Sequence, residues 1–400
     1  EEAAATDHNN FIFRRKKMEQ TLTIGMAHHN DYHGVYFTIQ DIRKELMYNR
    51  RYDLLQKIEF LVVENDPTSN HAGMVKDLEK KIRNLKVVDY TEKVGTSASR
   101  NKIIEEARTP FVLVMDCHVL LCPVVESLDR LFTFLEYNSK TQDLYTGSLV
   151  HDDLTGISTH YNDSWGGEMW GQWGSAWQCV CESFNFSVKN ENNKAAFFSL
   201  EKQEKLDKCV YCSREFPKNL KYAGHEGALG QEGYNRIGGK PSEPPFAVFA
   251  QGLGLFLTKK ISWLKFNEHA EGFGGEECYI HEKYRAEGRH TYNLPFLKWL
   301  HRFGRPDGVP YPLTLENKVR NYILEFTELG KDLAPVKKHF VDEGNMNKET
   351  FDRIEQECKK IYGTPKSTLD PEVLREIESL KIKIKQLSKS GCKNKTCKNN

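Results

Sequence analysis

Apolar runs alternate with amphipathic stretches along the first 130 residues. Strands are predicted at 21–25, 58–63, 86–90 and 111–116, and helices near 35–49, 72–84 and 95–107. Strands and helices that alternate at this spacing form βαβ units and a mainly parallel sheet. Ligands bind such sheets beyond the carboxyl ends of the strands. Four acids fall at these ends, which predicts a polar site there: Glu64, Asp66, Asp89 and Asp116.

The fourth strand carries the clearest candidate chemistry. Its apolar residues 111–115 show no polar alternation, which is typical of a strand covered on both faces, and it ends in Asp116-Cys117-His118. Strand side chains two residues apart point to the same side, so Asp116 and His118 converge. A carboxylate and an imidazole can hold a divalent cation of the manganese type. On this tripeptide alone, a polar strand end with a chance histidine is the alternative.

Four motifs follow one another in this half of the chain: VVEND (62–66), VVDY (87–90), GTSASRN (95–101) and FVLVMDCH (111–118). Their order resembles the nucleotide-sugar half of family 2 type glycosyltransferases with the GT-A fold. The Asp-x-His motif is similar to that of the polypeptide N-acetylgalactosaminyltransferases. The resemblance implies a nucleotide pocket lined by Glu64, Asp66, Asp89, Arg100 and Asn101, with the loop 27–31, beginning at Ala27, against the same nucleotide. Each acid taken singly is equally explained as a cap in a turn.

The resemblance resumes at residues 246–312. Strand character returns at 246–257, where Gly252 would border the donor sugar, because glycine permits close approach of a ligand. The segment EGFGGEE (271–277) looks like the Gly-Gly-Glu motifs of beta-galactosyltransferases and N-acetylgalactosaminyltransferases. By that likeness Glu276 and Glu277 are catalytic candidates. The acid at the position of Glu277 is the general base in inverting members, although Asp is usual where this chain has Glu.

The segment WLHRFGRP (299–306) resembles the stretch that completes the metal site in the N-acetylgalactosaminyltransferases. The likeness implies that His301 is the third metal ligand and that Arg302 and Arg305 bind the diphosphate, to which the planar guanidinium fork is suited. His281 and His290 compete with His301 for the role of ligand.

Residues 131–245 lie outside the resemblance and carry two further patterns. Residues 164–177 place tryptophans among glycines. Such aromatics suit stacking on sugars or bases, which makes Trp165, Trp170 and Trp173 acceptor-site candidates. A loop that buries its own tryptophans is the equal alternative.

Two close cysteine pairs follow the tryptophans. They can close a tetrahedral thiolate site for structural zinc, with free buried cysteines as the alternative and His160 and His225 as spare ligands. The four residues are Cys179, Cys181, Cys209 and Cys212.

Composition changes this picture little. The net charge of +1 gives no general attraction to polyanions, although residues 381–400 form a lysine-rich tail. No apolar run reaches the length of a membrane span, no secretory signal is visible, and a disulfide framework is not expected, which predicts a reducing, cytoplasmic location. The heptad spacing at 371–388 predicts either self-association into a homo-oligomer or docking on the chain's own body.

The expected organisation is a GT-A (Rossmann-like) α/β fold with a zinc-stapled insert and a helical C-terminal extension. Its parts are a disordered lead (1–20), a nucleotide-sugar half (21–130), an acceptor-side insert (131–245), a catalytic half (246–315) and a helical extension with the basic tail (316–400).

The expected activity is Mn²⁺-dependent transfer of a sugar from a UDP-sugar to an acceptor hydroxyl on a protein, glycan or modified DNA. Asp-x-His favours retention and Gly-Gly-Glu-acid favours inversion, so both outcomes stay open. A phage-type DNA glycosyltransferase acting on hydroxymethylated bases is one alternative, since an aromatic slot suits a flipped base. A catalytically inactive sugar-binding or scaffold protein with the same fold is the other.

Overall fold

The computed structural model describes residues 20–192, 194–217, 234–304 and 313–362. The chain divides into two compact units, Glu1–Met346 and Asn347–Asn400. The second unit contributes one described helix, α9 (Lys348–Ile361). All the described residues of the candidate sites lie in the first unit.

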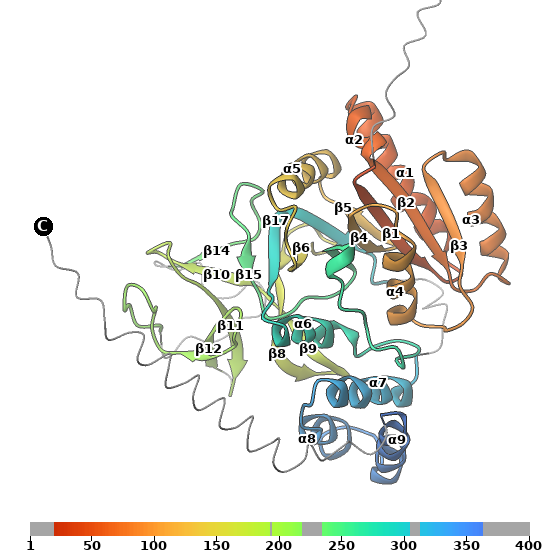
Figure 1. The fold of residues 1–400 in the computed structure, drawn as a ribbon. Coiled ribbons are helices and arrows are strands. Elements are labelled where there is room, and N and C mark those ends of the chain that lie inside the picture. Colours follow the sequence, from red (N-terminus) through yellow and green to blue (C-terminus); the bar gives the residue numbers. More distant parts are fainter. Residues whose placement is uncertain (1–19, 193, 218–233, 305–312, 363–400) are drawn as a thin grey trace, which may run out of the picture. The chain divides into compact units, whose positions relative to one another are not determined.

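A mainly parallel sheet forms the centre of the first unit (Figure 1). Its strand order is β15-β17-β6-β16-β4-β1-β2-β3, with β5 added to β17 and β7 to β6. The run β4-β1-β2-β3 is parallel, β6 and β17 are parallel to each other, and β16 runs against both of its neighbours. The strands are β1 (Leu22–His28), β2 (Ile58–Glu64), β3 (Leu85–Asp89), β4 (Phe111–Asp116), β5 (Val119–Leu121), β6 (Leu144–Val150), β7 (Ile157–Ser158), β15 (Phe246–Ala247), β16 (Leu255–Lys259) and β17 (Thr291–His301).

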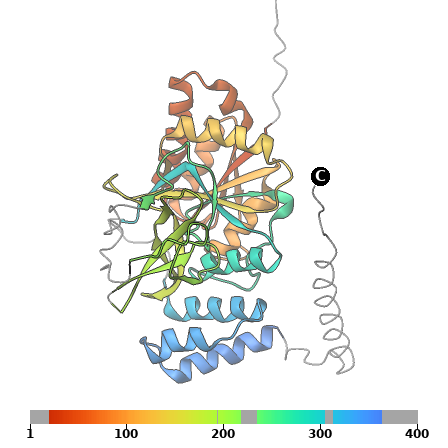
Figure 2. The same cartoon turned by 90° about the vertical axis from the view of Figure 1, so that its left-hand side faces the viewer.

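Helices cover both faces of this sheet (Figure 2). One face, which includes Ile24 and Phe60, packs against α1 (Tyr32–Tyr48), α2 (Tyr52–Lys57), α3 (Asn70–Lys81) and α5 (Val124–Tyr137). The other face, which includes Leu61 and Val114, packs against α4 (Thr96–Glu106) and α6 (Glu276–Ala286). Burial on both faces explains why these strands are continuous apolar runs. The predicted fold class is therefore confirmed.

The predicted elements of the N-terminal part are all present, with small shifts at their ends. For example, α1 begins at Tyr32, earlier than predicted, because the side chain of Asp31 caps it by accepting a hydrogen bond from the Gly34 N–H. The predicted strand over 246–257 is instead two strands, β15 and β16. Between them Gly252 packs so closely that an added Cβ would lie 2.8 Å from the Trp173 ring.

The insert forms two smaller sheets. β8 (His160–Gly166) and β9 (Met169–Gly174) pair as an antiparallel hairpin, so the tryptophan-rich segment is regular rather than a loop. A five-stranded sheet has the order β13-β12-β11-β10-β14. Its strands are β10 (Ala176–Cys179), β11 (Asn185–Glu191), β12 (Lys194–Ser199), β13 (Lys205–Leu206) and β14 (Tyr234–Arg236).

Helical structure follows the main sheet, as predicted for residues 316–362. The elements are α7 (Leu315–Glu328), α8 (Ala334–Lys337) and the π-helical turn η2 (Lys338–Asp342), and a 3₁₀ turn, η1 (Lys260–Ser262), lies earlier in the chain. The heptad seam at 371–388 lies outside the described residues. No helix among the described residues is long and apolar enough to cross a membrane.

Candidate active site

A pocket of about 470 Å³ opens at the carboxyl edge of the parallel strands. The strand register aligns the last residues of four strands at this edge. Ala27 pairs with Asp116, and Glu64 pairs with both His28 and Asp89. Residues from β1, β4, α4 and α7 and from the loops between the elements line the pocket, among them Ala27, His28, Asp31, Asn65, Gly95, Thr96, Arg100, Asp116, His118, Gly272 and Asn317. The edge is where parallel α/β sheets bind their ligands.

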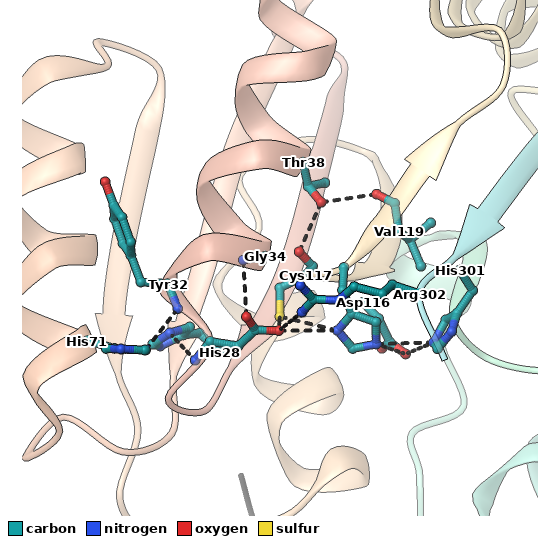
Figure 3. A network of polar contacts seen from close by, with 12 residues as sticks. His28, Tyr32, Gly34, Thr38, His71, Asp116, Cys117, Val119, His301 and Arg302 are labelled. Carbon is teal, nitrogen blue, oxygen red and sulfur yellow. Dashed lines mark hydrogen bonds and ion pairs between the residues drawn. The ribbon is translucent and has the colours of Figure 1, made fainter. Parts of the chain in front are cut away.

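Asp116, His118 and His301 converge at one side of the pocket. Figure 3 shows Asp116 beside His301. His118 Nε2 lies 3.1 Å from His301 Nε2, and Asp116 Oδ2 lies 3.6 Å from His301 Nε2 and 4.0 Å from His118 Nε2. A point equidistant from these three atoms lies about 2.1 Å from each, which is a usual bond length from a small divalent cation to nitrogen or oxygen. The residues present therefore fit a metal ion.

Backbone pairing explains how His301 reaches this position. The last residues of β17 pair antiparallel with β5, and His301 lies opposite Val119, the neighbour of His118. The competing histidines lie elsewhere. His281 is buried in α6 with Nδ1 near the Glu277 carbonyl oxygen, and His290 contacts Glu201 at the surface.

Asp31 contacts the ring nitrogen of His118 that does not face the proposed metal position. Its Oδ2 lies 3.6 Å from His118 Nδ1 and accepts a hydrogen bond of 3.0 Å from Arg302. Burial raises the pKa of Asp31, but the contacts with His118, the Gly34 N–H and Arg302 outweigh it and hold the pKa well below its usual range. A carboxylate on the second ring nitrogen orients a metal-binding histidine. The sequence analysis placed Asp31 only within a loop against the nucleotide.

Arg100 joins the metal side of the site to the glycine-rich loop. It is buried, and its guanidinium donates to Asp116 Oδ1 and to Glu276 Oε1, each at 3.0 Å. Burial by itself raises the pKa of Asp116, but Arg100 and the two histidines hold it well below its usual range. Arg100 lines the pocket, yet its hydrogen bonds are to these two carboxylates.

The glycine-rich segment brings two acids to the start of α6. Gly274 and Gly275 have φ of +95° and +107°, a conformation that favours glycine, and Glu276 and Glu277 follow in the first helical turn. Glu276 Oε1 accepts from Thr96 and Arg100, whereas Oε2 is buried with no hydrogen-bond partner among the described residues. The segment is fixed to the loop before α4 by two backbone hydrogen bonds between Gly272 and residues 94 and 96.

Glu277 has a different environment from Glu276. Its side chain makes no hydrogen bond or ion pair with the part of the chain that the structure describes, and it does not line the 470 Å³ pocket. Burial first, and then the Glu276 carboxylate, raise the pKa of Glu277 to about 8. A carboxyl group with a raised pKa is a stronger base once it has lost its proton.

Several predicted nucleotide residues are engaged in other contacts. Glu64 is fully buried, lies 2.5 Å from His28 Nδ1 and accepts from the Asp66 N–H. Asp66 also accepts from Thr68 and lies outside the pocket lining. Asp89 is exposed and forms an ion pair with Lys76.

The remaining nucleotide candidates also differ in their position. Asn101 bridges the backbone of Phe266 and the indole N–H of Trp263. Gly252 is buried against Trp173. Ala27 does line the pocket, and Arg302 contacts Asp31 beside it. Arg305 lies outside the described residues.

Two pocket residues were not singled out by sequence reasoning, although His28 belongs to the loop 27–31 that was placed against the nucleotide. Asn65 holds the 90–95 loop by donating to two backbone carbonyls, those of Tyr90 and Lys93, and accepting from the Gly95 N–H. His28 accepts from the Asp31 N–H while its other nitrogen faces Glu64. Their position at the ends of β1 and β2 was the available signal, since polar residues at this edge line the site.

The tryptophan candidates separate into two groups. Trp170 is buried and lies edge-on to Phe326 at a centroid distance of 5.0 Å, and Trp165 lies 5.1 Å from Tyr322. Both rings are therefore occupied by packing against α7. Trp173 is partly exposed and lies near Tyr161 and Trp299, the latter two residues before His301.

The N-terminal part of the chain matches the sequence model of a known family. Residues 23–154, which contain β1 to β4, Arg100, Asp116 and His118, match the model of glycosyl transferase family 2. The match covers about a third of the chain and shows that this segment is similar to family 2 glycosyltransferases. The resemblance predicted from the four motifs is thereby confirmed. His301 and both glutamates of α6 lie outside the matched family 2 segment.

Solved structures of other glycosyltransferases resemble this chain at low identity. A crystal structure of GalNAc-T7 with UDP, GalNAc and Mn²⁺ is 13% identical with a TM-score of 0.47, and the match covers 88% of this chain and 60% of that one. S. aureus TarS 1–349 is 10% identical (TM-score 0.39, coverage 88% and 77%). The mannosyltransferase PcManGT from Pyrobaculum calidifontis, with GDP-Man and Mn²⁺, is 11% identical (TM-score 0.40, coverage 91% and 81%). No curated protein sequence matches the chain.

Proposed function

We propose that the protein is a metal-dependent glycosyltransferase that moves a sugar from a UDP-sugar to an acceptor hydroxyl. One observation carries this proposal: Asp116, His118 and His301 converge within bonding range of a single cation at the carboxyl edge of a family 2 sheet. Two of these ligands come from the matched segment, and the third comes from β17. A scaffold protein without turnover has no need of such a set of ligands.

The metal proposed for this site is Mn²⁺, held by Asp116, His118 and His301. When bound, a divalent cation neutralises the charge that develops on a leaving diphosphate. Asp31 fixes the ring of His118, and Arg100 keeps Asp116 ionised and ready to bind the cation. Arg302, beside Asp31, and Arg305 are proposed to contact the diphosphate.

The 470 Å³ pocket is proposed to hold the nucleotide. Ala27, Asn65 and Gly95 border it, and the Asn65 hydrogen bonds keep its 90–95 wall in place. The roles first assigned to Glu64 and Asn101 become supporting ones, because their side chains are used within the protein. Glu276 is proposed to bind a hydroxyl of the donor sugar through Oε2, its unpartnered oxygen.

Glu277 is proposed to take the proton of the acceptor hydroxyl, in a reaction that inverts the anomeric centre. Its carboxylate is uncommitted among the described residues, and its raised pKa suits proton transfer near neutral pH. Trp173 is proposed to contact the acceptor, because its partly exposed ring lies near Trp299, two residues before His301. An acceptor protein, a glycan or hydroxymethylated DNA are the classes to be compared.

The test is transfer by the full chain from a panel of UDP- and GDP-sugars, with and without Mn²⁺, to protein, glycan and hydroxymethylated DNA acceptors. Mass spectrometry of the acceptors should show a sugar adduct that needs Mn²⁺ and a UDP-sugar. Isothermal titration with UDP and GDP measures donor choice without an acceptor. An absence of Mn²⁺-dependent binding of any nucleotide would overturn the proposal.

A further inference from the structure

Two tight turns of the insert face each other and bring four cysteines together. The first turn follows β10 and contains Cys179 and Cys181, and the second turn, after β13, contains Cys209 and Cys212. The sulfur atoms all lie within 4.8 Å of one another. We propose that these four thiolates hold one structural zinc ion, a site that is independent of the proposed glycosyl transfer.

The distances between the sulfurs match a tetrahedral zinc site. Cys179 Sγ lies 3.7 Å from Cys212 Sγ, and Cys181 Sγ lies 3.6 Å from Cys209 Sγ. Four sulfurs at about 2.3 Å from a central zinc ion stand about 3.8 Å apart along the edges of the tetrahedron. A disulfide would require about 2.05 Å. The arrangement is therefore that of one ion between the two turns rather than of two covalent bonds across them.

The backbone of both turns is shaped to hold the cysteines. In the first turn the Glu182 N–H donates to the Cys179 carbonyl oxygen at 2.8 Å, and in the second the Ser213 N–H donates to the Cys209 carbonyl oxygen at 3.0 Å. Glu182 and Ser213 each have φ of +57°. Two separate segments thus each reverse direction just after a cysteine pair, the first through a hydrogen bond over three residues and the second over four.

Backbone N–H groups also point at the sulfurs. Those of Tyr211 and Cys212 hydrogen-bond the Cys209 sulfur, and that of Arg214 hydrogen-bonds the Cys212 sulfur. These donors fix the direction of each sulfur lone pair, as outer-shell contacts do in metal sites.

The insert has a structural need for such an ion. Its core is a small cluster built around Trp177, Phe186, Phe197, Phe216 and Tyr234, with Cys179 and Cys209 fully buried in it. The segment 207–217 contains no helix or strand and is held mainly by the second turn. A small core gains stability from a metal that links distant segments. Because four thiolates fill a tetrahedral site, the ion has no open position for catalysis.

The zinc site is linked to the proposed acceptor side through buried polar contacts. Ser187 on β11 donates to Asn162 on β8 at 2.5 Å, and His160 Nε2 lies 2.9 Å from the same hydroxyl. The β8–β9 hairpin carries Trp173. A zinc ion between the two turns would therefore stiffen the five-stranded sheet whose strand β11 contacts this hairpin.

The experiment measures zinc in the purified full chain after dialysis against a mild chelator. Elemental analysis should find about one zinc per chain, and titration with an organomercurial reagent should release it as four thiols react. Cys181→Ser and Cys212→Ser should each reduce the zinc content at least about tenfold, whereas Cys122→Ser, a cysteine outside the cluster, should leave it unchanged. His301→Ala should also keep its zinc, which separates this site from the proposed Mn²⁺ site.

Cobalt provides a test that does not depend on the folding of a variant. Co²⁺ exchanged into the wild-type chain should give the visible spectrum of a tetrahedral tetrathiolate site, with sulfur-to-metal charge transfer. A cobalt spectrum without thiolate bands would overturn the proposal. So would a mass, measured without reductant, that is lower by four hydrogens, because it would show two disulfides. Zinc that persists in both cysteine variants would equally overturn it.

Discussion

His118 lies in the turn between β4 and β5, and His301 is the last residue of β17. They are 183 residues apart in the sequence, yet their Nε2 atoms lie 3.1 Å apart. The rings are nearly perpendicular, with an interplanar angle of 85°. Two nitrogens this close, with a carboxylate oxygen 3.6 Å from one of them, are arranged for a shared cation rather than for a hydrogen bond between rings. The antiparallel pairing of β5 with β17 produces this meeting.

Removal of one histidine should therefore abolish metal-dependent nucleotide binding. In His301→Ala the affinity for UDP in the presence of Mn²⁺ should fall at least about 100-fold, since loss even of an outer-shell partner costs 10–100-fold. Titration calorimetry with and without Mn²⁺ measures this. The melting temperature should change little, because His301 lies at the end of its strand. His290→Ala is the matched control, and an equal loss there would contradict the assignment of the third ligand.

Arg100 should be essential for stability as well as for the site. Arg100→Met removes the guanidinium group that pairs with the carboxylates of both Asp116 and Glu276. Removing one partner of a buried ion pair costs about 3–5 kcal/mol. Because the pKa of Asp116 is depressed in the folded protein, its contribution is present at neutral pH and is lost as the pH falls through the acidic range.

Denaturant unfolding of metal-free protein at pH 7 and pH 2.5 tests this account of Arg100, because the contribution of Asp116 is lost only below the pKa of the unfolded carboxyl, about 3.9. The loss of stability in Arg100→Met should be larger at pH 7 than at pH 2.5. Arg130→Met is the control, because its exposed pair with Glu126 is worth only about 0.3–0.5 kcal/mol. Equal losses at both pH values would mean that Arg100 acts by packing alone.

Sequence patterns predicted the parallel sheet well, because strands that are buried on both faces, such as β4, have uninterrupted apolar sequences. They also grouped His301 with Asp116 through motif order, although the pairing of β5 and β17 that joins them has no local signature. The contacts that individual side chains make could not be predicted from the sequence. Glu64 and Asn101 are polar residues at the expected edge, yet only the folded structure shows that His28 and the Phe266 backbone already occupy them.

The tryptophan-rich segment illustrates the same limit. Its glycines suggested a flexible loop, whereas β8 and β9 form a hairpin whose Trp165 and Trp170 pack on α7. Helix α7 lies far along the chain from this hairpin. The hydrophobic periodicity of either segment does not predict that the two pack together. The likeness of residues 299–306 to a known motif found His301, but the supporting role of Asp31 required the contact between Asp31 and His118.

Glu325 on α7 should make stability depend on pH. It is fully buried, and neither carboxyl oxygen has a hydrogen-bond partner among the described residues. Burial first, and then Glu276 and Glu277, raise its pKa well above the usual value. The folded state therefore binds a proton that the unfolded state releases above about pH 4.3, so stability falls as the pH rises from there.

Glu325→Gln cannot ionise and should flatten this dependence. Its melting temperature should fall less than that of the wild type between pH 5 and pH 8, as measured by calorimetry. Glu105→Gln, an exposed acid on α4, should keep the slope of the wild type. Parallel slopes for wild type and Glu325→Gln would show that the carboxyl group of Glu325 is ionised in both states.

Glu277→Gln should separate proton transfer from donor binding. The amide keeps the size of the side chain but cannot accept a proton, so transfer should fall by about 10²–10⁴-fold, the usual loss for a general base. The affinity for the UDP-sugar should hardly change, because Glu277 does not line the nucleotide pocket. Glu276→Gln should do the reverse and weaken sugar binding more than turnover, since Glu276 bonds to Arg100 and Thr96 at the pocket wall.

The pH profile and the stereochemistry of the product provide two independent checks on Glu277. A base must be deprotonated to act, and burial with the neighbouring Glu276 raises the pKa of Glu277 to about 8, so the rate of transfer should rise with pH through that region. The rise should be absent in Glu277→Gln, and NMR of the product should show an inverted anomeric centre. A retained product would exclude Glu277 from the role of base. An inverted product formed at a near-normal rate by Glu277→Gln would place the base on another residue.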